Sequence, residues 1–339
     1  MNDNSYEIED DSYYLYACAE LKSREREFVS GSRKERMMQA RDMDEFLKVL
    51  NDTSYASKIS MIGETGNFQG ALISVYKEIT NYLENRLKDE HKKIINILFF
   101  EEFLHNMKVL LKSSLLEKDF EDLYIPIKYE YGSLSRALDT QKYEDILDPV
   151  PDIIDHLREM IGISGDKDLR QLELDLEAFY VKKMLGTAES LSRKMMIDYV
   201  RHKIDLINIE TIYRRRQLKM KIPFSGIVHK GGFIKPKVLS DLETESMDYF
   251  VRELESTEYG DVIVRGAQQL FSDCSFASFE RNRDDYFLQY FDRIKYSVSN
   301  LEKIFHFFFR KKIEVLNINI LYTGIKYNVN KSNLECRID

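Results

Sequence analysis

The sequence predicts an all-α protein made of three pseudo-equivalent helical repeat domains, and three observations carry this prediction. Proline and glycine are scarce, with five and fourteen among 339 residues, which favours long uninterrupted helices. Apolar residues recur at helical spacing along much of the chain. The segment KIDLINIETIYRRRQ at 203–217 returns in similar form as KIEVLNINILYTGIK at 312–326. Such self-similarity indicates an internally repeated architecture.

The first elements are predicted from an apolar stripe and a capping signal. A helix is expected over residues 12–30, ending before Gly31, because one of its faces is apolar at Tyr14, Ala17, Cys18, Leu21 and Phe28. A second helix is expected after Asp42, with Glu45 as its capping-box partner. Residues 71–119 contain neither Pro nor Gly and predict two or more helices.

Two runs further along the chain have the three–four spacing of a helix–helix seam. The run at 287–308 consists of Phe287, Phe291, Ile294, Val298, Leu301, Phe305 and Phe308, and a shorter run covers 181–195. Both are interpreted as core, because apolar stripes at this spacing normally pack against another helix. Breaks are predicted at 148–152, 162–166 and 221–236, where Pro and Gly gather.

The repeated segments align at a fixed offset of 109 residues. Besides the asparagines Asn208 and Asn317, the matched pairs are Lys203/Lys312, Ile204/Ile313, Asp205/Glu314, Leu206/Val315, Ile207/Leu316, Ile209/Ile318 and Ile212/Leu321. A third, weaker copy is centred on Asn106. We therefore predict three domains, covering residues 1–138, 139–240 and 241–339.

The three asparagines have two readings. A buried amide that ties neighbouring elements together is favoured for Asn106, Asn208 and Asn317, because buried polar groups are normally satisfied inside the protein. Contact with a partner is the alternative.

Charge is segregated although the net charge is only −8. Residues 201–237 hold ten Lys and Arg against two acids, and residues 239–261 hold eight acids against one Arg. This pattern suits a surface that meets charged partners, or else solvated helix faces. The partner-contact candidates are Arg214, Arg215, Arg216 and Lys219, and the three arginines are expected to be exposed because adjacent guanidiniums are costly to bury unpaired.

Motifs for chemistry are weak. The stretch GETGNFQG at 63–70 lacks the Gly-Lys-Ser/Thr ending of a phosphate loop, so an ordinary loop is expected there. The histidines (His91, His105, His156, His202, His229 and His306) have no zinc-ligand spacing, and the cysteines (Cys18, Cys274 and Cys336) indicate reduced thiols. No nucleophile motif occurs. We expect no cofactor, no metal and no catalytic activity.

Composition predicts a soluble chain without a membrane span. The content of 43% hydrophobic and 32% charged residues is that of a globular protein. The beginning, MNDNSYEIEDD, is acidic where a signal peptide is basic. No window approaches eighteen uncharged apolar residues.

Several stretches carry a resemblance to a known family. They are YYLYACAELKSREREFVSG, MDEFLKVLNDTSY, the paired KIDLINIETIYRR and KIEVLNINILYTG, and the GGFI that follows the second copy. In their order and spacing they resemble the C subunit of A/V-type ATPases, which is similar to the d subunit of the eukaryotic vacuolar enzyme. The resemblance covers essentially the whole chain.

The resemblance implies a function. It implies a funnel of three helical domains on the cytoplasmic face of a membrane complex, between the central-stalk subunits and the proteolipid rotor ring. Such a part does no chemistry and transmits torque for proton or sodium transport coupled to ATP. The alternative is a helical nucleic-acid-binding or coiled-coil scaffold protein, motivated by the basic block at 201–237 and the seam at 287–308, although the overall acidity of the chain speaks against nucleic acid.

Overall fold

The fold is all-helical, as predicted. The computed structural model describes residues 6, 10–65, 67–163, 168–218, 224–273, 276–294, 296–335 and 337–338. Every regular element in these ranges is a helix. None of the helices in these ranges combines the length and the apolar character that a bilayer crossing requires.

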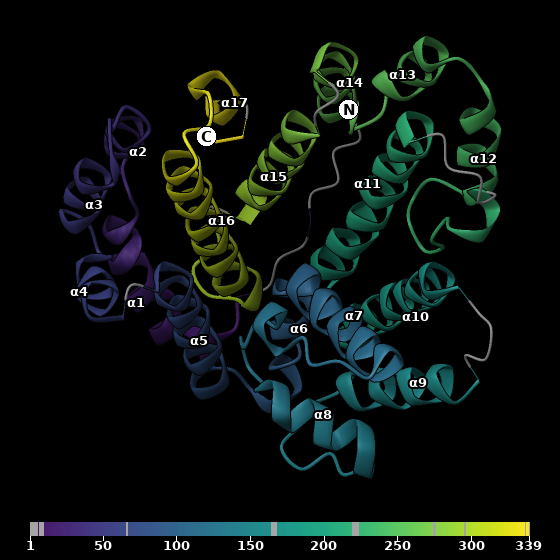
Figure 1. The fold of residues 1–339 in the computed structure, drawn as a ribbon, viewed down its shortest axis with the longest axis horizontal. Helices are drawn as coiled ribbons and strands as arrows, with labels where there is room; N and C mark the ends of the chain where they lie inside the picture. Colours follow the sequence, from purple (N-terminus) through teal and green to yellow (C-terminus); the bar gives the residue numbers. More distant parts are fainter. Residues whose placement is uncertain are drawn as a thin grey trace. The chain divides into compact units, whose positions relative to one another are not determined.

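The chain divides into two compact units, whose helices can be followed in Figure 1. One, the terminal unit, contains residues 1–79 and 247–339, so that the two ends of the chain share a unit. The other, the central unit, contains residues 80–246. The three predicted domains, 1–138, 139–240 and 241–339, and their funnel arrangement stay predictions.

The terminal unit draws its helices from both ends of the sequence. Its first part contains α1 (Leu15–Arg24), α2 (Gly31–Met38), α3 (Met43–Asn51), α4 (Ala56–Thr65) and the beginning of α5 (Phe68–Arg86). Its second part contains α13 (Met247–Glu255), α14 (Gly260–Asp273), α15 (Ala277–Phe291), α16 (Leu301–Lys326) and α17 (Lys331–Glu335). Aromatic rings join the two parts: Phe68 stacks on Tyr322 with ring centroids 3.6 Å apart, and Phe46 contacts both rings.

The beginning of the chain corrects one expectation and confirms another. The single helix expected over 12–30 is instead two 3₁₀ turns flanking α1, followed by extended backbone at Phe28 and Ser30. The predicted cap is present in a variant form, because Asp42 Oδ1 accepts a hydrogen bond from Glu45 N (2.8 Å) while Glu45 Oε2 accepts one from Arg41 N (2.9 Å), the residue before the N-cap. The two bonds fix the start of α3.

The seam predicted over 287–308 belongs to two helices. Helix α15 ends at Phe291, and α16 begins at Leu301 behind Asn300, whose Oδ1 accepts from Lys303 N (2.8 Å). The two halves of the run pack against each other, with the rings of Phe291 and Phe305 5.3 Å apart. Val298 lies in the turn and is 58% exposed. The core assignment is therefore wrong for Val298 alone, because the spacing of apolar residues carries through the turn by chance.

The central unit is a cluster of helices around α10. Its elements are the remainder of α5, then α6 (Ile94–Leu98), α7 (Phe100–Leu116), α8 (Tyr131–Thr140), α9 (Val150–Gly162), α10 (Leu169–Ser190), α11 (Lys194–Leu218) and α12 (Pro236–Thr244). Helix α10 packs against α6, α7, α9 and α11. The run at 181–195 crosses the turn between α10 and α11, where Ser192 has a φ of 54°.

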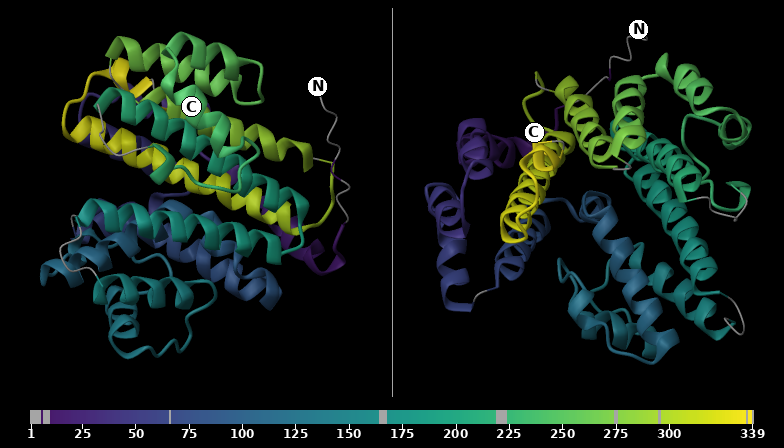
Figure 2. Two further views of the ribbon diagram at one scale, coloured as in Figure 1. Left: turned by 90° about the vertical axis from the view of Figure 1, so that its right-hand side faces the viewer. Right: turned by 45° about the horizontal axis from the view of Figure 1, so that its top comes forward.

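The Asn-centred segments are helical, as the continuous periodicity predicts. They form the C-terminal parts of α11 and α16, the two longest helices of the described residues (Figure 2). Apolar side chains on most sides of these segments are buried, among them Ile204, Ile209, Ile212, Ile318 and Leu321. Burial on several sides outweighs the preference of β-branched residues for strands.

Candidate partner-contact site

Asn208 and Asn106 hold the backbone of a connecting segment in the same way. Asn208, fully buried in α11, donates from Nδ2 to the carbonyl oxygen of His229 (2.9 Å) and accepts from His229 N (2.8 Å). Asn106 in α7 makes the same pair of bonds with Ile125 (2.8 and 2.9 Å). A primary amide can satisfy both backbone groups of one residue in this way. Asn317 is also buried, but its Nδ2 has no hydrogen-bond partner in the part of the chain that the structure describes.

Asp205, one turn before Asn208, fixes the GGFI loop. Its carboxylate is fully buried and accepts from Phe233 N (2.8 Å) and Ile234 N (3.1 Å). A Cβ on Gly232 would lie 2.0 Å from Asp205 Oδ1, so only glycine permits this approach. Gly231 has a φ of +108°, a conformation that L side chains rarely adopt. The two glycines are therefore required by the contact of this loop with α11.

An ionic network continues from the same loop to α7 and α10. Glu177 accepts from Lys108 Nζ (2.5 Å) and lies 3.3 Å from His229 Nε2. Burial alone would raise the pKa of Glu177, but the hydrogen bond from His229 and the charge of Lys108 outweigh it and lower the pKa to about 2. The carboxylate therefore stays ionised while it ties two helices to the loop.

Acid is expected to weaken the protein through Glu177. Because its folded pKa of about 2 lies below the ordinary 4.5, its contribution is complete above about pH 4.5 and is lost as the pH falls through about 2. The whole shift corresponds to roughly 3 kcal/mol. Urea unfolding at a series of pH values between these limits should show a free energy of unfolding that falls with pH, and Glu177→Gln should flatten the slope.

Glu173 provides the matched control, because it sits on the same helix and forms a partly exposed ion pair with Lys112 at 2.7 Å, whereas Glu177 is also bonded to His229. Partly exposed single ion pairs contribute little. Glu173→Gln should keep the acid slope of the unchanged protein. An equal flattening by both variants would contradict the assignment to Glu177.

The predicted arginine cluster does not form one exposed surface. Arg214 is the most exposed of the three and donates to Glu210 Oε1 (2.5 and 2.8 Å). The expectation of exposure is wrong for Arg215 and Arg216. Arg215 lies against Glu243 (3.1 Å), and Arg216 donates to the carbonyl oxygens of Leu242 and Glu243 (2.9 and 2.8 Å). These carbonyls end α12, where cations are favoured, and burial lowers the pKa of Arg216. Lys219 lies outside the described residues.

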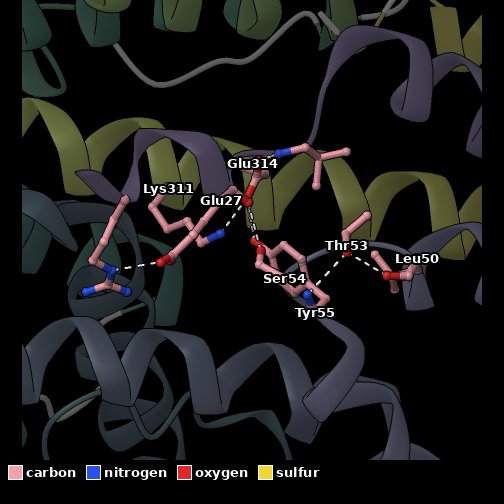
Figure 3. A network of polar contacts seen from close by, with 9 residues as sticks. Glu27, Leu50, Thr53, Ser54, Tyr55, Lys311 and Glu314 are labelled. Atoms are coloured by element: carbon pink, nitrogen blue, oxygen red, sulfur yellow. Dashed lines mark hydrogen bonds and ion pairs between the residues drawn. The ribbon is translucent and has the colours of Figure 1, made fainter. Parts of the chain in front are cut away.

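The terminal unit contains a counterpart of Asp205. Glu314 of α16, matched to Asp205 at the offset of 109, is buried and accepts from Val29 N (2.5 Å), Tyr55 Oη (2.9 Å) and Lys311 Nζ (2.6 Å) (Figure 3). Burial and then the charge of Glu314 hold the pKa of Tyr55 well above its usual value, so the hydroxyl remains a donor. Sequence reasoning matched the two acids in type but assigned them no role. An acid retained inside an apolar run was the available signal.

The remaining sequence candidates lie apart from one another. Residues 63–65 and 68–70 of the glycine-rich stretch are helical, at the end of α4 and the beginning of α5, where a loop was expected. Among the described residues, no group of three His, Cys, Asp or Glu side chains is placed to hold a metal ion. A cavity of about 350 Å³ between α14 and α15 has walls of both charges, including Asp261, Arg265 and Arg293, unlike the apolar pockets typical of small-molecule sites.

Comparison with known proteins places the sequence in a family. The family model for the ATP synthase (C/AC39) subunit matches residues 17–336. The C subunit of the A-type ATP synthase from Thermococcus onnurineus is 25% identical over 270 residues, which cover 74% of this chain and 69% of the relative. The C subunit of the V-type sodium ATPase from Enterococcus hirae is 21% identical over 321 residues, 94% of this chain and 95% of the relative. The chain therefore belongs to the ATP synthase (C/AC39) subunit family, as the repeated Asn-centred segments and the GGFI loop had indicated.

Proposed function

We propose that this chain is a non-catalytic adaptor in the rotor of an A/V-type ATP synthase. It would lie on the cytoplasmic face of the membrane and join the central-stalk subunits to the proteolipid rotor ring. Torque generated by ATP hydrolysis, or by the flow of protons or sodium ions, would pass through it. Three pseudo-equivalent domains arranged as a funnel would form the socket for the stalk.

The observation that supports this role best is a set of buried polar side chains that bind connecting segments to helices. A part that transmits torque must resist shear, and close-packed helices have low compressibility. In this chain Asn106, Asn208, Asp205 and Glu314 add hydrogen bonds that fix connecting segments onto long helices. Fully satisfied buried polar contacts rigidify a core and specify one arrangement. Loops held in this way would keep interface residues in register under load.

Purification from native membranes tests the proposal. The tagged chain, isolated gently under conditions in which ATP hydrolysis remains coupled to ion transport, is expected to bring down central-stalk subunits and the rotor-ring proteolipid. Recovery of the chain without either partner from membranes whose ATPase is intact would contradict the adaptor role.

Arg214 is the member of the arginine cluster suited to a partner-contact test, because Arg215 and Arg216 are engaged with α12. We expect Arg214→Glu to weaken retention of the stalk subunits about three- to tenfold and to change its salt dependence, since charges at an interface rim act mainly through electrostatic steering. Retention is measured as the fraction of stalk subunits bound at equilibrium to the immobilised chain at increasing salt. Arg193→Glu, just before the other end of α11, serves as the control, and equal effects of the two variants would remove Arg214 from the interface.

A further inference from the structure

A basic segment overlaps the GGFI loop and the beginning of α12, and we define it as Lys230, Phe233, Lys235, Lys237 and Val238. The three lysines are exposed, Phe233 is 42% exposed and Val238 is 45% exposed. No ammonium group of these lysines has an ion pair or a hydrogen bond to any other described residue. The segment therefore presents positive charge around an aromatic ring, without acids of its own to neutralise it.

The backbone of the segment and the ring of Phe233 are fixed, because side chains of α11 contact both. Asn208 and Asp205 bind the backbone at His229 and Phe233. The guanidinium of Arg201 lies 4.3 Å from the centroid of the Phe233 ring and donates to the carbonyl oxygen of Gly231 (3.2 Å). The ring of His202 lies 4.6 Å from that of Phe233. A surface ordered before binding loses little conformational entropy when a partner docks.

Two of the lysines lie at a helix end where a positive charge is unfavourable. Lys235 is the N-cap residue of α12 and Lys237 lies in its first turn, which contains no acid. A cation at a helix N-terminus opposes the helix dipole and destabilises the helix. Neither ammonium group is paired within the described residues, so no contact among them offsets this effect.

We propose that the basic segment docks an acidic face of another folded subunit of the ATP synthase complex. Carboxylates would meet the three lysines, and Phe233 would supply the apolar centre of the contact, as aromatic residues commonly do. The inference rests on the proposed function only in that it requires the chain to be assembled with other subunits; torque transmission is not required.

The held aromatic ring favours a folded protein over the other anionic partners. Lipid binding by basic segments is strengthened by apolar side chains that enter the bilayer boundary, whereas the part-exposed ring of Phe233 is held in place by its contacts with Arg201 and His202. Single-stranded nucleic acid requires a series of aromatic platforms, and the segment has one. Lysines carried next to a fixed backbone and a fixed ring match carboxylates on the surface of a second folded protein.

Zero-length coupling in the assembled complex tests the contact. A carbodiimide joins a lysine amine to a carboxylate that touches it, forming an amide while the carbodiimide takes up the elements of water and becomes a urea. We expect amide links from Lys230, Lys235 or Lys237 to Asp or Glu of another subunit, identified by peptide mass spectrometry. Links only to acids of this chain, or no links in a complex that is otherwise intact, would overturn the proposal.

Charge reversal supplies the second measurement. A variant that combines Lys230→Glu, Lys235→Glu and Lys237→Glu should bind the rest of the complex at least about tenfold more weakly. The weaker binding is measured as dissociation of the complex at a lower salt concentration. The matched control reverses the exposed lysines Lys118, Lys142 and Lys182 of the same unit, with an effect of less than about threefold. Both variants are first checked for unchanged helix content, and if the test variant fails to fold, the coupling experiment on the unchanged protein still decides.

Two further outcomes would reassign the surface. Binding of the free chain to phosphatidylglycerol vesicles, lost in the reversed variant while assembly is kept, would overturn the proposal in favour of lipid. The same loss with a single-stranded oligonucleotide would overturn it in favour of nucleic acid. Failure of the adaptor role is recognised separately, because stalk and ring subunits would then be missing from the purified material before any coupling is attempted.

Discussion

Replacing Gly232 with alanine is expected to lower the free energy of unfolding by roughly 3 kcal/mol, among the larger effects of a single methyl group. The new Cβ would lie 2.0 Å from Asp205 Oδ1. Asp205 has no room to withdraw without breaking its bonds to Phe233 N and Ile234 N. Each lost bond to a charged acceptor costs about 1.5–3 kcal/mol. Urea denaturation followed by circular dichroism measures the change.

Gly186 is the matched control for this substitution. It lies in α10 of the same unit, and a Cβ there would meet no atom within 4 Å. Gly186→Ala should therefore stabilise the protein by up to about 1 kcal/mol, because alanine is the better helix former. If Gly232→Ala lowers the free energy of unfolding by no more than about 0.5 kcal/mol, the loop can move away from α11. That result would contradict a fixed contact between Asp205 and the GGFI loop.

Replacing Glu314 with alanine is expected to cost about 3–5 kcal/mol, the range seen when one partner of a buried ionic contact is removed. The change leaves Lys311 Nζ, Val29 N and Tyr55 Oη without their acceptor (Figure 3). Because Val29 and Tyr55 belong to the beginning of the chain, its first helices should also detach more readily from α16. Limited proteolysis of residues 25–55 and denaturant unfolding measure the two effects.

A double-mutant cycle with Tyr55→Phe tests whether the loss arises at this contact. The bond from Tyr55 Oη to Glu314 is 2.9 Å long and buried. The two substitutions together should cost less than the sum of their separate costs, with a coupling of about 1–3 kcal/mol, because each alone orphans the same interaction. Strict additivity would argue that Glu314 acts through something other than Tyr55.

Local patterns predicted the helices but not all of their ends. Helix α3 was placed correctly because Asp42 and Glu45 form a cap within a few residues of each other. The turn before α16 was missed although Asn300 caps that helix. Apolar spacing continued across it from Phe291 to Phe305, and spacing alone does not distinguish one straight helix from two that fold back on each other.

The candidate site was predicted only in part. The offset of 109 residues identified Asn208 and Asn317 as equivalent, but their surroundings differ: Asn208 holds His229, whereas Nδ2 of Asn317 is unpaired within the described residues. The arginine triplet was read as exposed because neighbouring charges resist burial, and no pattern in the sequence placed Glu243 and the end of α12 beside it. Position in three dimensions decided which guanidinium remains on the surface.

Helical periodicity, the scarcity of Pro and Gly, and the returning Asn-centred segment were enough to predict an all-α chain, because each depends on residues a few positions apart or on direct comparison of two stretches. The pairing of distant segments needed the folded molecule. Val29 meets Glu314 across 285 positions, and Phe233 meets Asp205 across 28. Such contacts form where burial makes an unsatisfied carboxylate costly, and burial is a property of the packed helices rather than of any one of them.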